Sequence, residues 1–419
     1  MTIATETCED LAIDAHRLWS DLMALADIGA DSVGGVTRPA LSPADRQARQ
    51  FLVDRMRTAG LDVRIDAALN VIGTSATSHP VTQQRAIIGS HLDTVPGGGR
   101  FDGALGVICG LECARTLREH GVALPWNLEV ISFCDEEGAH HAGTFGSRAM
   151  IGSLRSDEIH QEGEQGRPSF VRHLQQAGGD PAGIAGARRS ADEFAFFLEV
   201  HIEQGRVLEA EAVDIGAVTA IAGIERVEVT VFGEAAHAGT TPMSMRQDAL
   251  VAAAPLFTLL PQWAAEQNPE MVATIGRVAL SPGAVNVVPG QCRFIVELRS
   301  RDAEDMRAVL ERLEGHAAGT TGWRIEPVYR KPPAALSPRI QDSIQQAARQ
   351  EGLSVRSLPS GAGHDAASFA PHVPSGMIFV PCRNGISHRP EESITRQQAA
   401  NGCQVLLRTL LLLAQKARP

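Results

Sequence analysis

Histidine and acidic side chains gather in four short segments that lie far apart in the chain. In order along the sequence they are His91, Asp93, Asp102, Glu136, Glu137, His201 and His388. Imidazole and carboxylate groups are ligands for zinc and similar divalent ions, and this set is too large for one tetrahedral ion. The residue types therefore predict two metal ions that share a bridging ligand, a geometry that activates water for hydrolysis.

The spacing within two of these segments suggests separate roles. Asp102 is the expected bridge, because its side chain is short and the neighbouring glycines permit close backbone approach. Of the adjacent pair Glu136 and Glu137, one is expected to bind metal while the other acts as a general base. Asp93 lies two residues from His91 and is expected to fix the tautomer of its imidazole.

Each of these residues also has a plain structural interpretation. Asp102 could be a helix N-cap, and Asp93 could form a turn before Thr94, Val95 and Pro96. The glutamate pair could be a solvated loop surface, and an isolated histidine after a strand is usually not a ligand. The coincidence of four polar segments favours the metal site.

The four segments follow apolar runs that predict buried strands of a parallel sheet. These runs are 85–89, 128–133, 194–200 and 376–380. A helical pattern over 103–120 separates the first two, and strand, helix, strand is the crossover unit of a doubly wound α/β sheet. Ligands collect at the carboxyl ends of strands in such sheets, so the polar segments are expected to meet there.

The middle of the chain has a different pattern. Strands are predicted at 227–232, 272–280, 291–299 and 323–329, and helices at 246–260 and 302–317. This β-α-β-β-α-β order predicts a ferredoxin-like α+β domain inserted into the first one. Helices over 339–351 and 397–415 then resume the α/β pattern. The expected domain boundaries divide the chain into 1–213, 214–331 and 332–419.

Bulk composition excludes several partners. The 419 residues carry a net charge of −11, without the basic patches that a nucleic-acid partner requires. No run approaches the length of a membrane span, and the first residues lack the features of a secretory signal. A cytoplasmic location with no membrane partner is therefore expected. The seven cysteines form no CxxC pair, so neither a disulfide framework nor a thiolate zinc site is indicated.

Seven longer motifs, in order from about residue 20 to residue 395, point to a known family. They are GSHLDTVPGGGRFDGALGV, FCDEEGAHHAGTFGSRAM, EVHIEQGRVLE, AHAGTTPMSMRQDAL, VNVVPG, SGAGHDA and GISHRPEE. Together they resemble the hydantoinase/carbamoylase-type amidases, which include L-N-carbamoyl-amino-acid amidohydrolases and allantoate amidohydrolases. This family belongs to the aminoacylase-like dinuclear zinc metallopeptidases.

The resemblance implies a fold and a metal centre. The fold is a phosphorylase/hydrolase-like, doubly wound catalytic domain with an inserted ferredoxin-like domain that serves as lid and dimerisation module. The implied ligands are His91, Asp102 and His201 for one ion, and Asp102, Glu137 and His388 for the other. Glu136 is the implied base. Two zinc ions are expected, although manganese, cobalt or nickel would suit the same ligands.

The resemblance also implies residues that bind substrate. His237 corresponds to a histidine that reaches the neighbouring subunit of a homodimer and polarises the scissile carbonyl. Gln204, Asn286 and Arg299 stand where the family binds the carboxylate and amide of a small-molecule substrate. A guanidinium presents a planar fork to a carboxylate, which supports this role for Arg299. One departure is Glu297, where many relatives have aspartate.

The expected activity is hydrolysis of a linear, non-peptide C–N bond, with an N-carbamoyl-L-amino acid converted to the amino acid, carbon dioxide and ammonia. Three alternatives remain open. Allantoate amidohydrolases share every ligand, and aminoacylases or dipeptidases share the fold, although peptidase relatives tend to use a carboxylate at the position of His201. A catalytically silent binding protein is disfavoured because all five ligands and the base are present.

Overall fold

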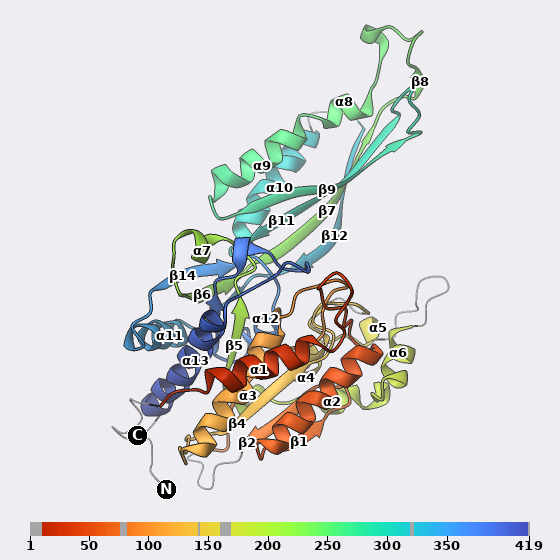
Figure 1. Ribbon diagram of the computed structural model, residues 1–419. Helices are drawn as coiled ribbons and strands as arrows, with labels where there is room; N and C mark the ends of the chain where they lie inside the picture. Colours follow the sequence, from red (N-terminus) through yellow and green to blue (C-terminus); the bar gives the residue numbers. More distant parts are fainter. Residues whose placement is uncertain (1–10, 76–81, 141–142, 160–168, 319–321, 418–419) are drawn as a thin grey trace. The chain divides into compact units, whose positions relative to one another are not determined.

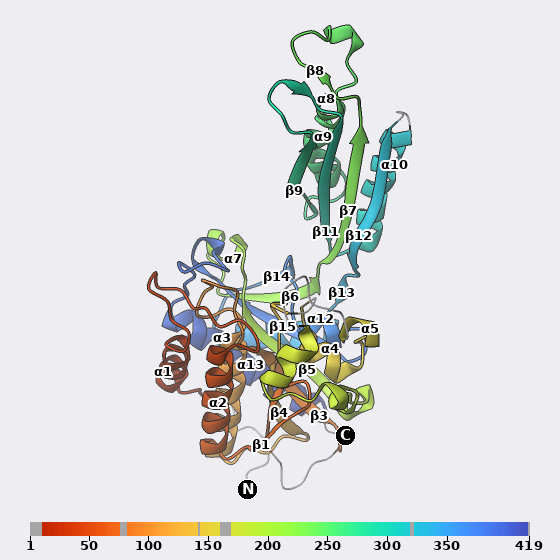
Figure 2. The same cartoon turned by 90° about the vertical axis from the view of Figure 1, so that its right-hand side faces the viewer.

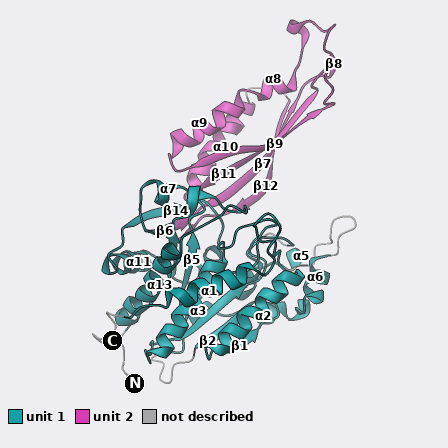
Figure 3. Ribbon diagram, in the orientation of Figure 1, with its two compact units in different colours: residues 1–219, 336–419 teal, residues 220–335 magenta. Residues whose placement is uncertain are grey.

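The computed structural model describes residues 11–75, 82–140, 143–159, 169–318 and 322–417. The chain divides into two compact units, unit 1 with Met1–Thr219 and Leu336–Pro419, and unit 2 with Ala220–Ala335 (Figure 3). Both divisions fall a few residues after the boundaries drawn from the sequence. In strand β6 (Ile215–Ile221), Gly216 and Ala217 pair with β15 of unit 1. The sheet of unit 1 therefore includes residues beyond the expected boundary at residue 213.

Unit 1 is built around a mixed sheet, which has nine strands within the described residues if the short strand Ala334–Ala335 at the edge of unit 2 is counted. Its order is β1-β2-β4-β3-β5-β15-β6-β13, with β14 paired to β6 (Figure 1). Besides β6, the strands are β1 (Asp62–Ile65), β2 (Val71–Ser75), β3 (Arg85–His91), β4 (Asn127–Phe133), β5 (Phe194–Ile202), β13 (Ala334–Ala335), β14 (Val355–Ser360) and β15 (Ser375–Val380).

The strands at the centre of this sheet are parallel. Strand β3 runs parallel to β4 and β5, and β15 runs parallel to β5. Strand β2 is antiparallel to β1 and β4, and β6 is antiparallel to β15. The expectation of a parallel, doubly wound sheet is therefore correct for the strands that precede the polar segments and wrong for the flanks. An antiparallel neighbour needs only a short connection, such as the turn between β1 and β2.

The central strands are apolar because both of their faces are covered. Ile88, Val130 and Leu198 point to a core that they share with α3 and α13. On the opposite face, Phe197 stacks on Phe369 of α12, with ring centroids 4.5 Å apart. Alternate residues of a strand face opposite sides of the sheet, so a strand buried on both sides consists mainly of apolar residues.

The helices of unit 1 include those expected from the sequence. They are α1 (Ala15–Ala26), α2 (Pro43–Thr58), α3 (Ala104–Glu119), α4 (Phe145–Ile151), α5 (Ser156–Ile159), α6 (Phe170–Gln176), α7 (Val207–Ala210), α11 (Pro338–Gln350), α12 (Ala366–Phe369) and α13 (Arg396–Lys416). Helix α3 packs very closely on the sheet, since a Cβ atom at Gly106 would lie 2.4 Å from the carbonyl oxygen of Val200 in β5. This close contact places the start of α3 beside the end of β5.

Unit 2 contains a four-stranded antiparallel sheet in the order β12-β7-β11-β9 (Figure 2). Its strands and helices are β7 (Gly223–Phe232), α8 (Ala249–Ala253), α9 (Leu256–Gln267), β9 (Val272–Ser281), β11 (Gln291–Ser300), α10 (Ala303–Ala318) and β12 (Trp323–Lys331). The single helix expected over 246–260 is two helices, with Pro255 as N-cap of the second. Proline lacks the amide hydrogen that a continuous helix needs.

A short two-stranded ladder completes unit 2. It joins β8 (Ala236–His237) to β10 (Val287–Val288), with His237 opposite Val287. Across the described residues of both units, no helix combines the length and apolar character needed to cross a membrane.

Candidate metal centre

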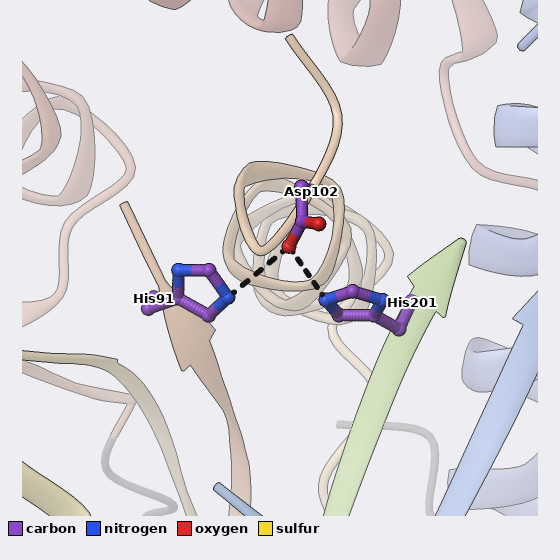
Figure 4. A group of neighbouring side chains, drawn as sticks. All are labelled: His91, Asp102 and His201. Carbon is purple, nitrogen blue, oxygen red and sulfur yellow. Dashed lines mark ion pairs between the residues drawn. The ribbon is translucent and has the colours of Figure 1, made fainter. Parts of the chain in front are cut away.

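The expected metal ligands meet at the carboxyl ends of the central strands. His91 is the last residue of β3, and His201 is the second last of β5. Glu137 stands in the loop after β4, and His388 stands in the loop after β15. Asp102 lies just before α3, between the two histidine-bearing strands (Figure 4). The parallel core of the sheet thus assembles side chains that are almost 300 residues apart in the chain.

Asp102 is the member that two groups of donors share. Its Oδ1 atom lies 3.4 Å from Nε2 of His91 and 3.1 Å from Nε2 of His201 (Figure 4). Its Oδ2 atom lies 3.5 Å from Nε2 of His388, which is 3.3 Å from Oε1 of Glu137. In each group one potential ligand atom per residue lies within 4.8 Å of the others. One carboxylate oxygen therefore faces each pair of partners.

The donor chemistry of this cluster fits a cation. Nδ1 of His91 is 2.9 Å from the carbonyl oxygen of Asp93, and Nδ1 of His201 is 2.9 Å from that of Ile202. A carbonyl can only accept, so each Nδ1 carries the hydrogen and a neutral ring directs its Nε2 lone pair at Asp102. Ligands about 2.0–2.1 Å from a tetrahedral zinc ion lie roughly 3.3 Å apart, close to the observed spacing.

The electrostatics of the cluster also favour binding of a cation. Burial opposes a charged imidazole at His91, but the carboxylates of Glu136 and Asp102 outweigh it and raise its pKa well above the usual value. Hydrogen bonds that His388 donates to the carboxylates of Asp102 and Glu137 raise its pKa to about 10. Burial works against ionisation of Asp102, yet His201 and the other histidines hold its pKa well below normal. These carboxylates attract positive charge strongly, and a divalent ion would displace the protons.

Asp102 does not cap α3, so its plain structural interpretation is wrong. The N-cap is Gly103, and no side chain caps this end of the helix. Gly103 has φ +64°, and a Cβ atom there would lie 2.4 Å from Cε1 of His91, so this position requires glycine. The tight backbone turn directs the Asp102 carboxylate at the histidines instead of along the helix axis.

Gln204, which was expected to bind substrate, also contacts Asp102, the expected bridging ligand. Its Nε2 atom donates to Oδ2 of Asp102 at 2.7 Å, and Oγ of Ser387 donates to the same oxygen at 2.7 Å. The Oε1 atom of Gln204 is buried without a hydrogen-bond partner among the described residues. The amide can therefore hold the bridge with one end and accept from a ligand with the other.

Glu136 and Asp93 occupy neighbouring positions with different functions. Oε2 of Glu136 is 3.7 Å from Nε2 of His91, and Glu136 belongs to neither donor group. The carboxylate of Asp93 accepts from the backbone N–H groups of Glu136, at 3.3 Å, and Glu137, at 3.1 Å. The tautomer of His91 is set by the backbone carbonyl of Asp93, not by its carboxylate as expected, which is 3.8 Å away.

Sequence reasoning overlooked a second layer of buried acids and a histidine. Glu199 accepts from Oγ of Ser90 at 2.9 Å and from the backbone of Ala366 at 3.0 Å. With His201 and His364 it forms a third group of potential ligands. His364 lies in the SGAGHDA motif. Nothing in the sequence indicates that these groups are buried together.

Unit 2 brings His237 and Asn286 together. The backbone N–H of Ala238 donates to the carbonyl oxygen of Asn286. Nδ1 of the exposed His237 accepts from the N–H groups of Gly239 at 3.0 Å and Thr240 at 3.2 Å. The ring hydrogen of neutral His237 is therefore on Nε2, which is free to donate outward.

Arg299 lies elsewhere in unit 2. It is near the far end of β11 from Gln291, and the strand rises about 3.3 Å per residue, which separates these two residues by roughly 26 Å. Nε of Arg299 donates to Oε1 of Glu297 at 2.8 Å, and Glu297 also pairs with Arg226. Arg299 is thus remote from His237 within one chain, and Glu297 is a partner that the sequence did not indicate.

A mixed α/β sheet that gathers histidines and carboxylates at the ends of its parallel strands fits a metal-dependent hydrolase. Residues 87–412 match the model of peptidase family M20/M25/M40, and the chain belongs to this family. It is similar over nearly its whole length to amidases of the hydantoinase/carbamoylase family. One solved example, from Burkholderia multivorans, has a TM-score of 0.87 and 34% identity, covering 96% of this chain and 98% of the other.

Two relatives of known name are similar over almost their full length. The N-carbamoyl-L-amino acid amidohydrolase of Geobacillus stearothermophilus is 39% identical, over 96% of this chain and 99% of the relative. The allantoate amidohydrolase of Escherichia coli (strain K12) is 34% identical, over 93% of this chain and 96% of the relative. Both similarities span both units of the chain.

Proposed function

We propose that this chain is a dinuclear metal-dependent amidohydrolase that cleaves the ureido group of N-carbamoyl-L-amino acids. The products are the L-amino acid, carbon dioxide and ammonia. The observation that carries the proposal is the convergence of two donor groups on the two oxygens of Asp102. The substrate class is supported by the 39% identity to an N-carbamoyl-L-amino acid amidohydrolase.

Five residues would hold two divalent ions, one group being His91, Asp102 and His201 and the other Asp102, Glu137 and His388. When bound, such ions polarise a carbonyl oxygen and lower the pKa of water, which makes it a nucleophile at neutral pH. Zinc is the proposed metal. Manganese, cobalt and nickel accept the same imidazole and carboxylate ligands.

Glu136 is the proposed general base. It takes a proton from the attacking water and passes it to the nitrogen that leaves. Burial raises the pKa of Glu136 well above its usual value, and Asp365 and Glu137 add to this although His91 opposes it. A raised pKa makes the carboxylate a stronger base. Asp93 holds the backbone of this residue, and so keeps the carboxylate beside the donor groups.

Arg299 and His237 are the proposed contacts to the substrate. The guanidinium of Arg299 would bind the substrate carboxylate, held in place by Glu297. Nε2–H of His237 would donate to the carbonyl oxygen as negative charge develops there. Gln204 and Asn286 would contact the polar groups between them.

His237 is proposed to act in the site of a second copy of the chain, with unit 2 as both lid and dimerisation module. The separation of His237 from Arg299 along β11 supports this arrangement, because one substrate molecule is too short to contact both in one chain. Mixing two inactive variants, His237→Ala and Glu136→Gln, tests it. A mixed dimer would contain one complete site, and activity should return; no recovery after verified subunit exchange would contradict the arrangement.

Parallel assays test the substrate class. The metal-loaded enzyme is given N-carbamoyl-L-amino acids, allantoate and N-acetyl-L-amino acids at equal concentrations, and release of ammonia or free amine is measured. We expect the highest kcat/KM on N-carbamoyl-L-amino acids, and weak or no activity on their D-enantiomers. The 34% identity to an allantoate amidohydrolase makes allantoate the second candidate. Activity confined to N-acetyl-L-amino acids would contradict the ureido assignment.

A further inference from the structure

Glu392 joins two loops that carry metal ligands. It stands four residues after His388 in the segment HRPEE and is only 2% exposed. Its Oε1 atom accepts hydrogen bonds from the backbone N–H groups of Phe101 at 2.9 Å and Asp102 at 3.1 Å. A single carboxylate oxygen thus fixes the peptide groups on both sides of the Cα atom of Phe101, and with them the start of Asp102.

The surroundings of this carboxylate are shaped to receive it. A Cβ atom at Gly99 would lie 1.9 Å from the carboxyl carbon of Glu392, so only glycine leaves room there. The other oxygen, Oε2, is 3.3 Å from Oγ of Ser387. The same hydroxyl donates to Oδ2 of Asp102 at 2.7 Å. Glu392 is therefore enclosed by both loops. It contacts the backbone N–H of Asp102 directly and is linked to its carboxylate through Ser387.

The contacts of Glu392 with residues 101 and 102 require an acceptor oxygen at this position. An amide oxygen also accepts backbone hydrogen bonds, so a glutamine would keep these two contacts.

We propose that Glu392 is a positioning residue that sets the bridging carboxylate of Asp102 in register with His388, so that both donor groups can bind metal. The inference rests on the proposed pair of ions at Asp102. Glu392 touches neither ion nor substrate in this role. It acts through the backbone of residues 101 and 102 and through Ser387.

Metal affinity is the measurement that tests it. Metal-free wild type, Glu392→Ala and Glu392→Gln are titrated with Zn²⁺ against a competing chelator, and the rise in Tm on adding Zn²⁺ is recorded. We expect Glu392→Ala to bind at least one ion about 10–100-fold more weakly and to show a smaller rise in Tm. Glu392→Gln should stay within a few fold of wild type, because its amide oxygen can accept both N–H groups.

Two controls separate positioning from general stability. Glu391→Gln changes an exposed neighbour in the same segment and should leave zinc affinity unchanged. Gly99→Ala should weaken zinc binding by displacing Glu392, but should add little to Glu392→Ala, because the clash is then absent. Fully additive effects of the two substitutions on zinc affinity would overturn the inference.

The remaining outcomes distinguish the two proposals. If wild type binds two zinc ions and Glu392→Ala binds them equally well, with only a lower Tm, Glu392 is a structural residue and the inference is wrong. If His91→Ala binds zinc as tightly as wild type does, the metal centre lies elsewhere. In that case the proposed function fails, and the inference fails with it.

Discussion

At the scale of single residues, Asp102 gives each donor group one oxygen of its own. His91 and His201 each donate an Nδ1 hydrogen to a backbone carbonyl, so the direction of their Nε2 lone pairs is set by the main chain. Glu136 lies beside this centre but outside both groups. A substitution can therefore remove the proposed base without removing a ligand.

Glu136→Gln should keep zinc and lose turnover. The amide has nearly the same shape but cannot take a proton from water, and general-base catalysis contributes about 10²–10⁴-fold. We expect kcat on an N-carbamoyl-L-amino acid to fall by about that factor, with two zinc ions retained by elemental analysis. A rate near that of wild type would remove Glu136 from the base role.

The residue scale is also where sequence and structure agree best. Residue type and position after apolar runs indicated Asp102 and the three histidines, whereas the choice of Glu137 over Glu136 as a ligand came from the family resemblance. Glu392 could not be found in this way, because its partners are backbone groups about 290 residues earlier. Asp93 was expected to set the tautomer of His91 and does so, but through its backbone carbonyl, because the sequence does not show which oxygen of a residue makes a contact.

At the scale of elements, α3 and β5 bring Asp102 to His201. Gly106 lets the helix approach the carbonyl of Val200, and any side chain there would push the two apart. Gly315 in α10 is also a helical glycine, but a Cβ atom there would meet nothing within 4 Å. Replacing glycine by alanine at these two positions should therefore have opposite effects on the stability of the protein.

Gly106→Ala should destabilise the protein by about 1–3 kcal/mol, because the added methyl group overpacks the contact between helix and strand. Gly315→Ala should stabilise it by about 0.5–1 kcal/mol, because alanine loses less conformational freedom in a helix. Urea denaturation of both variants measures the two values. A stabilising Gly106→Ala would show that the helix can move away without cost.

Elements were predictable where hydrophobic periodicity was strong. The apolar runs of β3, β4, β5 and β15 gave strands within one or two residues of those observed. Strand β1 was not expected, since three of its four residues are exposed and no apolar run marks it. The direction of the flanking strands also could not be predicted, because it depends on which neighbours they pair with.

At the scale of the whole molecule, buried acids link stability to pH. Burial raises the pKa of Asp135 and of Asp365 to about 8. A carboxyl group whose pKa is higher in the folded state binds more protons when folded, so ionising it lowers stability. His388 acts in the same direction, because its favourable charge is fully present below pH 6.5 and is lost as pH rises through about 10.

The metal-free protein should therefore be less stable at about pH 9 than at about pH 5. Its Tm should fall across this range, since all three groups hold their protons more tightly in the folded state than in the unfolded state. Zinc should make Tm depend less on pH. A metal-bound histidine no longer titrates, and the positive charge of the ion offsets the negative charge of the carboxylates. Differential scanning calorimetry with and without zinc measures both curves. A metal-free Tm that rises with pH would contradict this assignment.

Strand β15 lies between β5 and β6 in the sheet, although it belongs to the last part of the chain. During synthesis on the ribosome, a nascent chain that ends before this strand has a gap in the centre of its sheet. The donors His91, Asp102 and His201 have then emerged, while His388 has not. The second donor group therefore cannot form until the segment after β15 has been synthesised, and a chain truncated before His388 would lack that group.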